Sequence, residues 1–253
     1  MSGRAAVVLA AALVGGCRER APAPAVEPPR DAPVTATDAR AAGVDAAAPD
    51  AMPTATIVDW PIPWPPERAA LMLDYRRAHE DPAATDLTIR PTTIVLHYTA
   101  GGSAKGTHRY FSRTEIEPGR AALRAAGVVN VSAHFLVDRD GTIFRLVPED
   151  RMARHCIGLN HNSIGVENVG DEDRWPLTDA QIEANAQLVR HLVARWPITR
   201  LIGHYEARLL DGTPAFVERD PSFRNRKPDP GPRFMEAVRA RVADLGLDGA
   251  PAP

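Results

Sequence analysis

The distribution of apolar residues predicts a set of short buried strands between about residue 90 and residue 202. Five apolar runs of strand length occur, at residues 92–98, 131–138, 142–147, 163–169 and 198–202. The first run is bounded by Pro91 and by Gly101-Gly102, which are residues that break regular structure. The second and third runs flank Arg139-Asp140-Gly141, and this turn sequence predicts a β-hairpin.

Three further segments carry the signals of helices. Residues 67–79 follow a Pro-Pro pair, which is typical of a helix start. The clearest helix begins at Thr178, which can form a capping box with Gln181, and it ends near Trp196 before Pro197. A last helix starts near Pro232. The apolar residues are Leu71, Leu73 and Tyr75 in the first helix, and Phe234, Val238 and Val242 on one face of the last.

Strands and helices interleave, with the hairpin in the middle, so we predict an α/β domain. Its expected architecture is a mixed central β-sheet with helices on both faces. The first 59 residues contain no Phe, Trp or Tyr, so the core must come from the rest of the chain, which is long enough for one domain. We place this domain at residues 56–248, with a helical extension at 56–90 that Trp60 and Trp64 pack onto the main part.

The N-terminus has the pattern of a targeting segment. A short n-region with Arg4 precedes an apolar stretch at residues 5–16, which is too short to span a bilayer. Cys17 comes directly after it, which predicts a lipoprotein signal peptide at 1–17 with Cys17 as the lipid attachment site. Residues 18–55 are mostly Ala and Pro and predict a disordered linker. We therefore expect a lipoprotein that faces the periplasm from the outer membrane; the alternative is a secreted soluble protein.

Composition and motifs exclude several classes of function. The net charge is −2 without a basic stripe, so we expect no nucleic-acid partner. The chain has no Cys-x-x-Cys pair, no H-E-x-x-H helix, no G-x-S-x-G and no phosphate-binding glycine loop. If Cys17 carries lipid, Cys156 is an odd thiol, which we interpret as a small buried hydrophobe. We expect the protein to be a monomer.

Three residues form a candidate zinc site. His97 and His204 each end an apolar run, at the point where the chain leaves the sheet and where α/β folds assemble their sites. Asp229 lies in the rigid turn Lys227-Pro228-Asp229-Pro230-Gly231. A His2Asp set suits zinc with a fourth position open for water. Taken singly, each of these residues also fits a packed histidine or an ordinary turn aspartate.

Other carboxylates compete with Asp229 for this place. They are Glu206, Asp211 and Asp220. Glu206 is the best substitute, because in an extended segment it would share the side of the chain with His204, two residues before it. Glu167, on the strand at 163–169, is either a solvated strand residue or a carboxylate that needs a partner such as a metal-bound water.

Four segments together carry a resemblance to a known family. They are V-L-H-Y-T-A-G around His97, S-I-G-V-E ending at Glu167, I-G-H ending at His204, and K-P-D-P-G-P at 227–232. In this order they resemble the type-2 N-acetylmuramoyl-L-alanine amidases, zinc enzymes related to phage lysozyme-type amidases and peptidoglycan recognition proteins. The resemblance runs from about residue 90 to the last helix. One departure is that 24 residues separate His204 from Asp229, which we interpret as an inserted loop at 205–226 that alters one wall of the cleft.

The resemblance implies a reaction and a role for each residue. Zn²⁺ would be held by His97, His204 and Asp229, while Glu167 assists the attacking water and Lys227 stabilises the oxyanion. His155 and His134 would line the substrate groove. The substrate would be peptidoglycan or muropeptides, cut at the amide between N-acetylmuramic acid and L-alanine. The alternatives are a non-catalytic peptidoglycan-binding or sensing lipoprotein, and a zinc hydrolase that acts on another acyl-amide.

Overall fold

The computed structural model of the protein describes residues 55–252, and these residues belong to one compact unit. The predicted signal peptide with Cys17, and all of the predicted linker except Ala55, lie outside the described residues. Within the part that is described, no helix is both long and apolar enough to cross a bilayer.

A six-stranded sheet forms the centre of the fold, with the strand order β1-β4-β3-β5-β2-β6. The strands are β1 (Ile57–Asp59), β2 (Thr93–Tyr98), β3 (Phe135–Val137), β4 (Ile143–Arg145), β5 (Ser163–Asn168) and β6 (Arg200–Gly203). Only β3 and β4 pair antiparallel, and the other neighbours are parallel. The mixed sheet predicted from the sequence is therefore confirmed, and its strand β2, which lies between β5 and β6, is buried along nearly its whole length.

The antiparallel pair is the predicted hairpin. Asp138 donates its backbone N–H to the carbonyl of Thr142 at 2.9 Å, which closes the turn. Gly141 has φ +89°, a conformation that favours glycine, and a Cβ there would lie 2.9 Å from the carbonyl oxygen of Ala180. The turn residue therefore also permits the close approach of the helix that contains Ala180.

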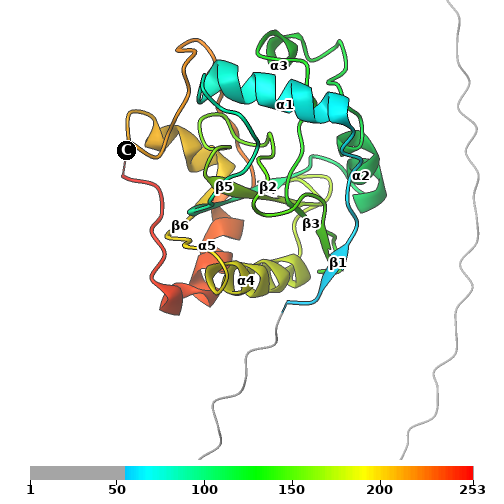
Figure 1. The fold of residues 1–253 in the computed structure, drawn as a ribbon. Helices are drawn as coiled ribbons and strands as arrows, with labels where there is room; N and C mark the ends of the chain where they lie inside the picture. Colours follow the sequence, from blue (N-terminus) through cyan, green and yellow to red (C-terminus); the bar gives the residue numbers. More distant parts are fainter. Residues whose placement is uncertain (1–54, 253) are drawn as a thin grey trace, which may run out of the picture. The chain divides into compact units, whose positions relative to one another are not determined.

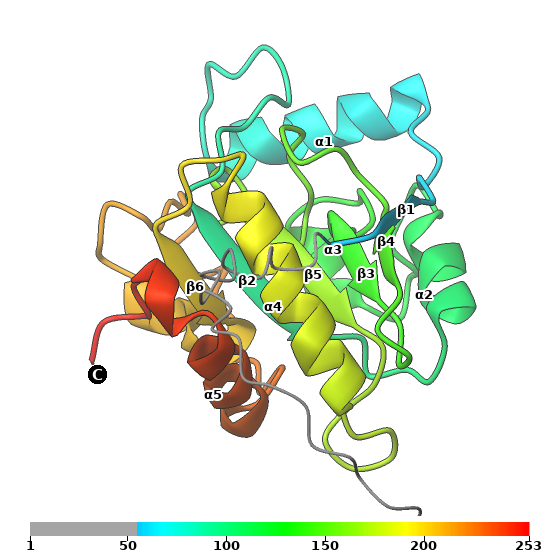
Figure 2. The same cartoon turned by 90° about the horizontal axis from the view of Figure 1, so that it is seen from below.

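Helices cover both faces of the sheet, as predicted. They are α1 (Pro66–His79), α2 (Ala104–Phe111), α3 (Ala121–Ala125), α4 (Asp179–Val193) and α5 (Pro232–Arg241), with 3₁₀ helices η1 (His204–Leu210) and η2 (Ala243–Leu245). Figures 1 and 2 show α4 and α5 against one face of the sheet and α1 across the opposite side. Helices α2 and α3 are short and were not predicted from the sequence.

Gln181, which takes part in the N-terminal cap of helix α4, also fixes this helix to the sheet. Thr178 and Gln181 form the predicted capping box. The Gln181 amide also donates to the carbonyls of Val137 and Val169, at 3.2 and 3.0 Å, in the interior. Apolar side chains of α4 and α5, among them Leu188 and Val238, then pack against the sheet to form the main core.

Helix α1 differs from its prediction in the face that it buries. Leu71 and Leu73 are only half-buried, whereas Met72, Tyr75 and the guanidinium of Arg68 are fully buried. Arg68 is tolerated there because it donates to the carbonyls of Phe111 and Arg113, which lie at and just beyond the end of α2. The buried face of α1 could not be predicted from the positions of apolar residues, because a charged residue, Arg68, lies on it.

The N-terminal extension is more than helical. Strand β1 pairs with β4 and forms an edge of the sheet, which the sequence analysis did not anticipate. Trp60 then stacks on His108 of α2, with ring centroids 3.9 Å apart, and Trp64 packs on the neighbouring apolar cluster.

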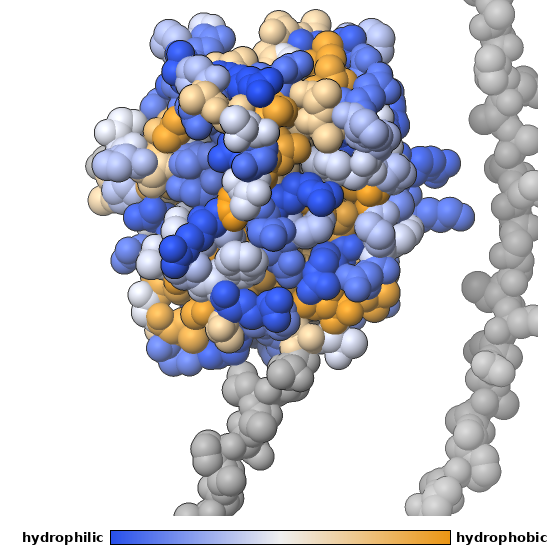
Figure 3. All heavy atoms as spheres, viewed as in Figure 1, coloured by the Kyte–Doolittle hydropathy of each residue, from blue (hydrophilic) through white to orange (hydrophobic). Residues whose placement is uncertain are grey.

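Hydrophobic residues are scattered over the face drawn in Figure 3, and the exposed large apolar side chains of the described residues are Val58 and Leu209.

Candidate metal centre

Three adjacent parallel strands carry the site at their carboxyl ends. The register of β2 and β5 sets His97 opposite Glu167. On the other side of β2, Leu96 pairs with Gly203, and His204 comes at the next position as the first residue of η1. Residues far apart in the sequence therefore stand in one row, because parallel strands end at the same edge of a sheet.

Asp229 completes this group from the loop that precedes α5. Its backbone carbonyl accepts a hydrogen bond of 2.9 Å from the backbone N–H of Tyr205, so the loop is attached to the start of η1. Asp229 is only 6% exposed. The side chain is thus held beside His204 by a backbone contact as well as by its own hydrogen bonds.

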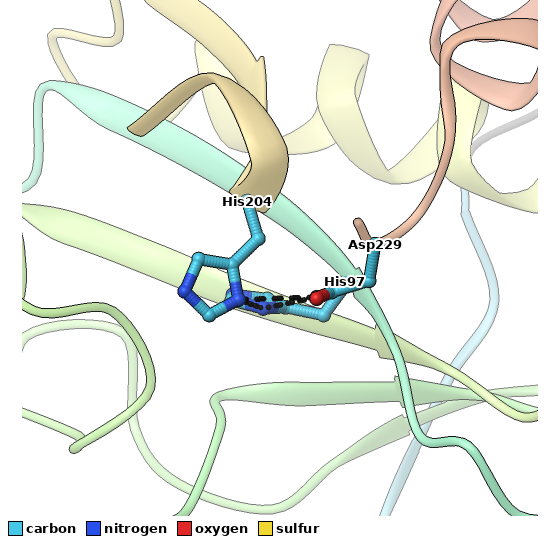
Figure 4. Close-up of side chains that lie close together, drawn as sticks. All are labelled: His97, His204 and Asp229. Carbon is cyan, nitrogen blue, oxygen red and sulfur yellow. Dashed lines mark hydrogen bonds and ion pairs between the residues drawn. The ribbon is translucent and has the colours of Figure 1, made fainter. Parts of the chain in front are cut away.

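The two histidines and the aspartate form a closed triangle of ligand atoms. His97 Nδ1 lies 2.9 Å from His204 Nδ1 and 3.2 Å from Asp229 Oδ2, and His204 Nδ1 lies 3.1 Å from the same oxygen. Figure 4 shows the three side chains converging on one point. Among the described residues, these three are the group of His, Cys, Asp or Glu side chains close enough to hold a metal ion together.

The dimensions of the triangle fit zinc. Zinc binds histidine nitrogen and carboxylate oxygen at about 2.0–2.2 Å, which separates tetrahedral ligand atoms by roughly 3.3 Å. The three distances are close to this value, and all three residues line an open cleft of about 700 Å³. A fourth ligand position can therefore face the cleft, as in catalytic zinc sites.

His155 determines which nitrogen of His97 faces the triangle. The Ser163 carbonyl can only accept, so His155 Nε2, at 3.4 Å, is assigned as the donor to it. His155 Nδ1 then accepts from His97 Nε2–H at 3.1 Å, which leaves the Nδ1 lone pair of His97 free for a metal. Gly165 makes room for this arrangement, since a Cβ there would lie 2.5 Å from the His155 ring.

Burial and charge favour the ligand forms of these groups. Burial lowers the pKa of His97 to about 4, with a further contribution from His204, although Asp229 acts in the opposite direction. Burial alone would raise the pKa of Asp229, but its hydrogen bonds to His204 and His97 outweigh this and hold the pKa well below its usual range. At neutral pH the site therefore presents a neutral imidazole and a carboxylate, as zinc requires.

Glu167 lines the same cleft with a buried carboxyl group. Its Oε2 is buried and has no hydrogen-bond partner among the described residues. The pKa of Glu167 is raised to about 8, by burial first and then by the negative charge of Asp229, while the positive charge of Lys227 acts in the opposite direction. A carboxyl group in a cleft whose pKa lies close to neutral pH can both accept and release a proton, which suits acid/base chemistry. Lys227 is half-buried and lines the cleft beside it.

The other predicted groove residue, His134, lies in the interior. It is fully buried, its Nδ1 accepts from the backbone N–H of Gly165, and its Nε2 donates to the carbonyl of Arg151. With both nitrogens occupied by backbone groups, this ring offers nothing to a ligand. We therefore replace the predicted substrate contact of His134 by a packing role, whereas His155 does line the cleft.

Glu206 is not a substitute for Asp229. Its carboxylate accepts from the backbone N–H of Gly203 at 2.8 Å and pairs with Arg239 at 2.6 Å, away from the triangle. The reason is that residues after His204 form a 3₁₀ helix and not the extended segment assumed from the sequence.

The remaining two candidate carboxylates are also used elsewhere. Asp211 pairs with Arg208 and Arg224, and Asp220 accepts from Ser222. Cys156 is a buried free thiol in an apolar cluster with Val95, in accord with the sequence interpretation.

Several residues of the cleft wall were not predicted from the sequence. Phe223 and Asn225, from the end of the insertion, and Arg120, before α3, line the cleft. The one available signal was the position of Phe223 and Asn225 just before Lys227 in the chain. Nothing in the sequence pattern points to Arg120.

Comparison with known proteins matches residues 87–232 to a family described as N-acetylmuramoyl-L-alanine amidase. The 1,6-anhydro-N-acetylmuramyl-L-alanine amidase AmpD of Salmonella typhimurium is 36% identical over 126 residues, which cover 46% of this chain and 59% of that protein. The endolysin of Escherichia phage T7 is 35% identical over 85 residues, covering 32% of this chain and 56% of the endolysin. The alignments thus span less than two thirds of these relatives.

Two solved structures are similar over larger shares of the chain. The N-acetylmuramoyl-L-alanine amidase LysC from Clostridium intestinale has a TM-score of 0.48 and 21% identity, covering 77% of this chain and 100% of that one. A selenomethionine derivative of AmpD has a TM-score of 0.45 and 25% identity, covering 72% and 92%.

Proposed function

The chain belongs to the N-acetylmuramoyl-L-alanine amidase family, whose model matches residues 87–232, and from this premise we propose that it hydrolyses the amide between N-acetylmuramic acid and L-alanine in peptidoglycan or its fragments. The observation that carries the proposal is the triangle of His97, His204 and Asp229 at the base of an open cleft. The name of AmpD, which is an amidase of this kind, supports the choice of substrate.

Each polar residue of the cleft has a place in such a reaction. A zinc ion held by the triangle would supply a Lewis acid and a water acidic enough to attack an amide at neutral pH. Glu167 takes a proton from the attacking water and delivers it to the leaving amine, since it lines the same cleft as the triangle. The Lys227 ammonium stabilises the negative charge that develops on the carbonyl oxygen.

The proposal extends to where the protein acts. Peptidoglycan lies outside the cytoplasmic membrane, and the apolar stretch before Cys17 has the length of a lipoprotein signal peptide. The protein would therefore be anchored through a lipid on Cys17 and face the periplasm, with the cell wall within reach.

Digestion of purified peptidoglycan with and without a chelator tests the proposed reaction. The expected products are glycan strands with intact lactyl groups and peptides with a new L-alanine amino terminus, identified by mass. Chelation should stop their release and zinc should restore it. Products cut at a glycosidic or a peptide bond would contradict the proposal, and a zinc-loaded protein that binds the wall without cutting it would be the non-catalytic binding module instead.

A further inference from the structure

The insertion at 205–226 helps to form a second hollow beside the cleft. This hollow has a volume of about 420 Å³ and lies between α3 and the end of the insertion. The cleft and the hollow share walls at Leu123, Ile157, Phe223, Asn225 and Lys227. Because Lys227 borders both spaces, a ligand in the metal site can continue into the hollow without leaving the protein surface.

The wall of the hollow is held in place from α1. His79, at the end of α1, has its Nδ1 2.8 Å from a Glu218 carboxylate oxygen and its Nε2 2.7 Å from the Ala126 carbonyl. Its ring also contacts that of Phe223, with centroids 5.0 Å apart. One buried histidine thus fixes both sides of the hollow, the insertion through Glu218 and Phe223 and the α3 side through Ala126.

A second set of contacts fixes the insertion against the loop after His155. Phe216 occupies the space beside Gly158, where a Cβ would lie 2.4 Å from the aromatic ring. Arg224 lies over the ring of Phe216 and donates to the backbone carbonyls of Asp220 and Phe223. The hollow is therefore formed before any ligand arrives, so its occupation needs little ordering of the chain.

The chemistry of the hollow is apolar at the base and cationic at the rim. Alanines 122, 125 and 126 of the α3 region, with Phe223, supply the apolar surface. Arg226 is exposed at the rim, and its guanidinium makes no hydrogen bond or ion pair with any described residue. The rim carboxylate, Asp220, already accepts two hydrogen bonds from Ser222. An unpaired guanidinium next to apolar surface favours a partly apolar ligand that carries a carboxylate.

The opposite side of the metal site has the reverse charge. Asp229 lines the cleft there, and the Glu172 carboxylate lies against Gly231 at the start of α5. An anionic ligand that spans the site is therefore oriented with its negative end toward the insertion.

We propose that the hollow is a subsite for the carboxylate-bearing part of the stem peptide, beyond the L-alanine whose amide is cut, with Arg226 as the residue that binds the carboxylate. This inference rests on the proposed amidase function. It assigns the insertion a task in substrate selection, because peptides with free carboxylates gain a contact that amidated peptides do not.

The test compares two substrates with two matched variants of the zinc-loaded protein. The substrates are a muramoyl tripeptide with free carboxylates and the same compound with its carboxylates amidated. Arg226→Gln removes the rim charge, and Arg219→Gln removes an equally exposed charge of the same insertion that does not line the hollow. Arg226→Gln should raise KM for the free-carboxylate substrate by about three- to tenfold, the worth of an exposed charge-assisted contact, with kcat unchanged.

The remaining combinations serve as controls. Arg226→Gln should leave KM for the amidated substrate as in the unchanged protein, and Arg219→Gln should alter neither substrate. The subsite would be overturned if both variants changed KM for the free-carboxylate substrate equally. It would also be overturned if Arg226→Gln raised KM equally for both substrates. If the unchanged protein cuts neither substrate, the proposed amidase function fails first, and this outcome is separate from a failure of the subsite.

Discussion

At the scale of single residues, the carboxylates of Asp229 and Glu167 have roles that separate when each is removed alone. Asp229 is the charged member of the triangle, so Asp229→Ala should lose most of its zinc, and amidase turnover should fall in step. Zinc content by elemental analysis, measured beside turnover, checks this. Excess zinc should restore a little of both.

Glu167→Ala is the matched counterpart, because this carboxylate lines the cleft but is not part of the triangle. It should keep its zinc, while turnover falls by roughly 10²- to 10⁴-fold, the usual effect of removing a positioned acid/base. Lys227→Ala should also keep zinc and lose about 10²-fold or more. Loss of zinc from Glu167→Ala would make this glutamate a ligand, and unchanged turnover would rule out the mechanism.

The hydrogen bond between His155 and His97 gives a second prediction at this scale. His155→Phe keeps a ring beside Gly165 but removes the acceptor for His97 Nε2–H, so His97 is no longer held in the tautomer that binds metal. Zinc affinity, measured by competition with a chelator, should fall by about 10- to 100-fold. His134→Phe is the control, since it should lower the melting temperature without changing zinc affinity. Equal zinc affinity in both variants would contradict the assignment.

At the scale of elements, the end of α1 makes stability depend on pH. Glu80, the residue after α1, is buried, and neither of its carboxylate oxygens has a hydrogen-bond partner among the described residues. Burial raises its pKa to about 8, with Arg76 lowering it and Glu218 raising it. Between the ordinary pKa of 4.5 and about 8, the unfolded chain has released this proton and the folded chain still holds it. This group's contribution to stability therefore falls as pH rises through that window.

Glu80→Gln removes this dependence, because an amide does not titrate. The variant should be more stable than the unchanged protein at pH 8.5, and the difference in melting temperature should shrink toward pH 5. Thermal unfolding at both pH values, with the zinc content held equal, measures the difference. A difference that stays constant with pH would show that Glu80 is ionised in the folded protein. The exposed Asp74→Asn, on the same helix, should show no such trend.

At the scale of the whole molecule, the untested prediction concerns the anchor, which lies outside the described residues. If Cys17 carries the lipid, Cys17→Ser should release the protein from membrane fractions or leave it unprocessed. Fractionation and then mass measurement of the N-terminus distinguish these outcomes. Cys156→Ser is the control, because that buried thiol should not affect partitioning. Unchanged membrane association of Cys17→Ser would exclude lipid anchoring at this residue.

The sequence by itself determined the features that depend on short stretches of chain. The hairpin, the capping box of α4 and most strand positions result from turn residues, caps and periodicity, whose interactions reach only a few residues along the chain. His97, His204 and Asp229 were also identified, since each lies in or ends a recognisable segment and the segments occur in the order of a known family.

The tertiary structure decided which of the remaining side chains meet. His155 lies beside His97 only because Gly165 leaves space on the neighbouring strand, and His134 is removed from the cleft by backbone partners more than ten residues away. Glu206 turns from the site because Arg239 of α5 pairs with it. These contacts join segments that are distant in sequence. They are set by how strands and helices pack in three dimensions, and no periodicity along the chain encodes such packing.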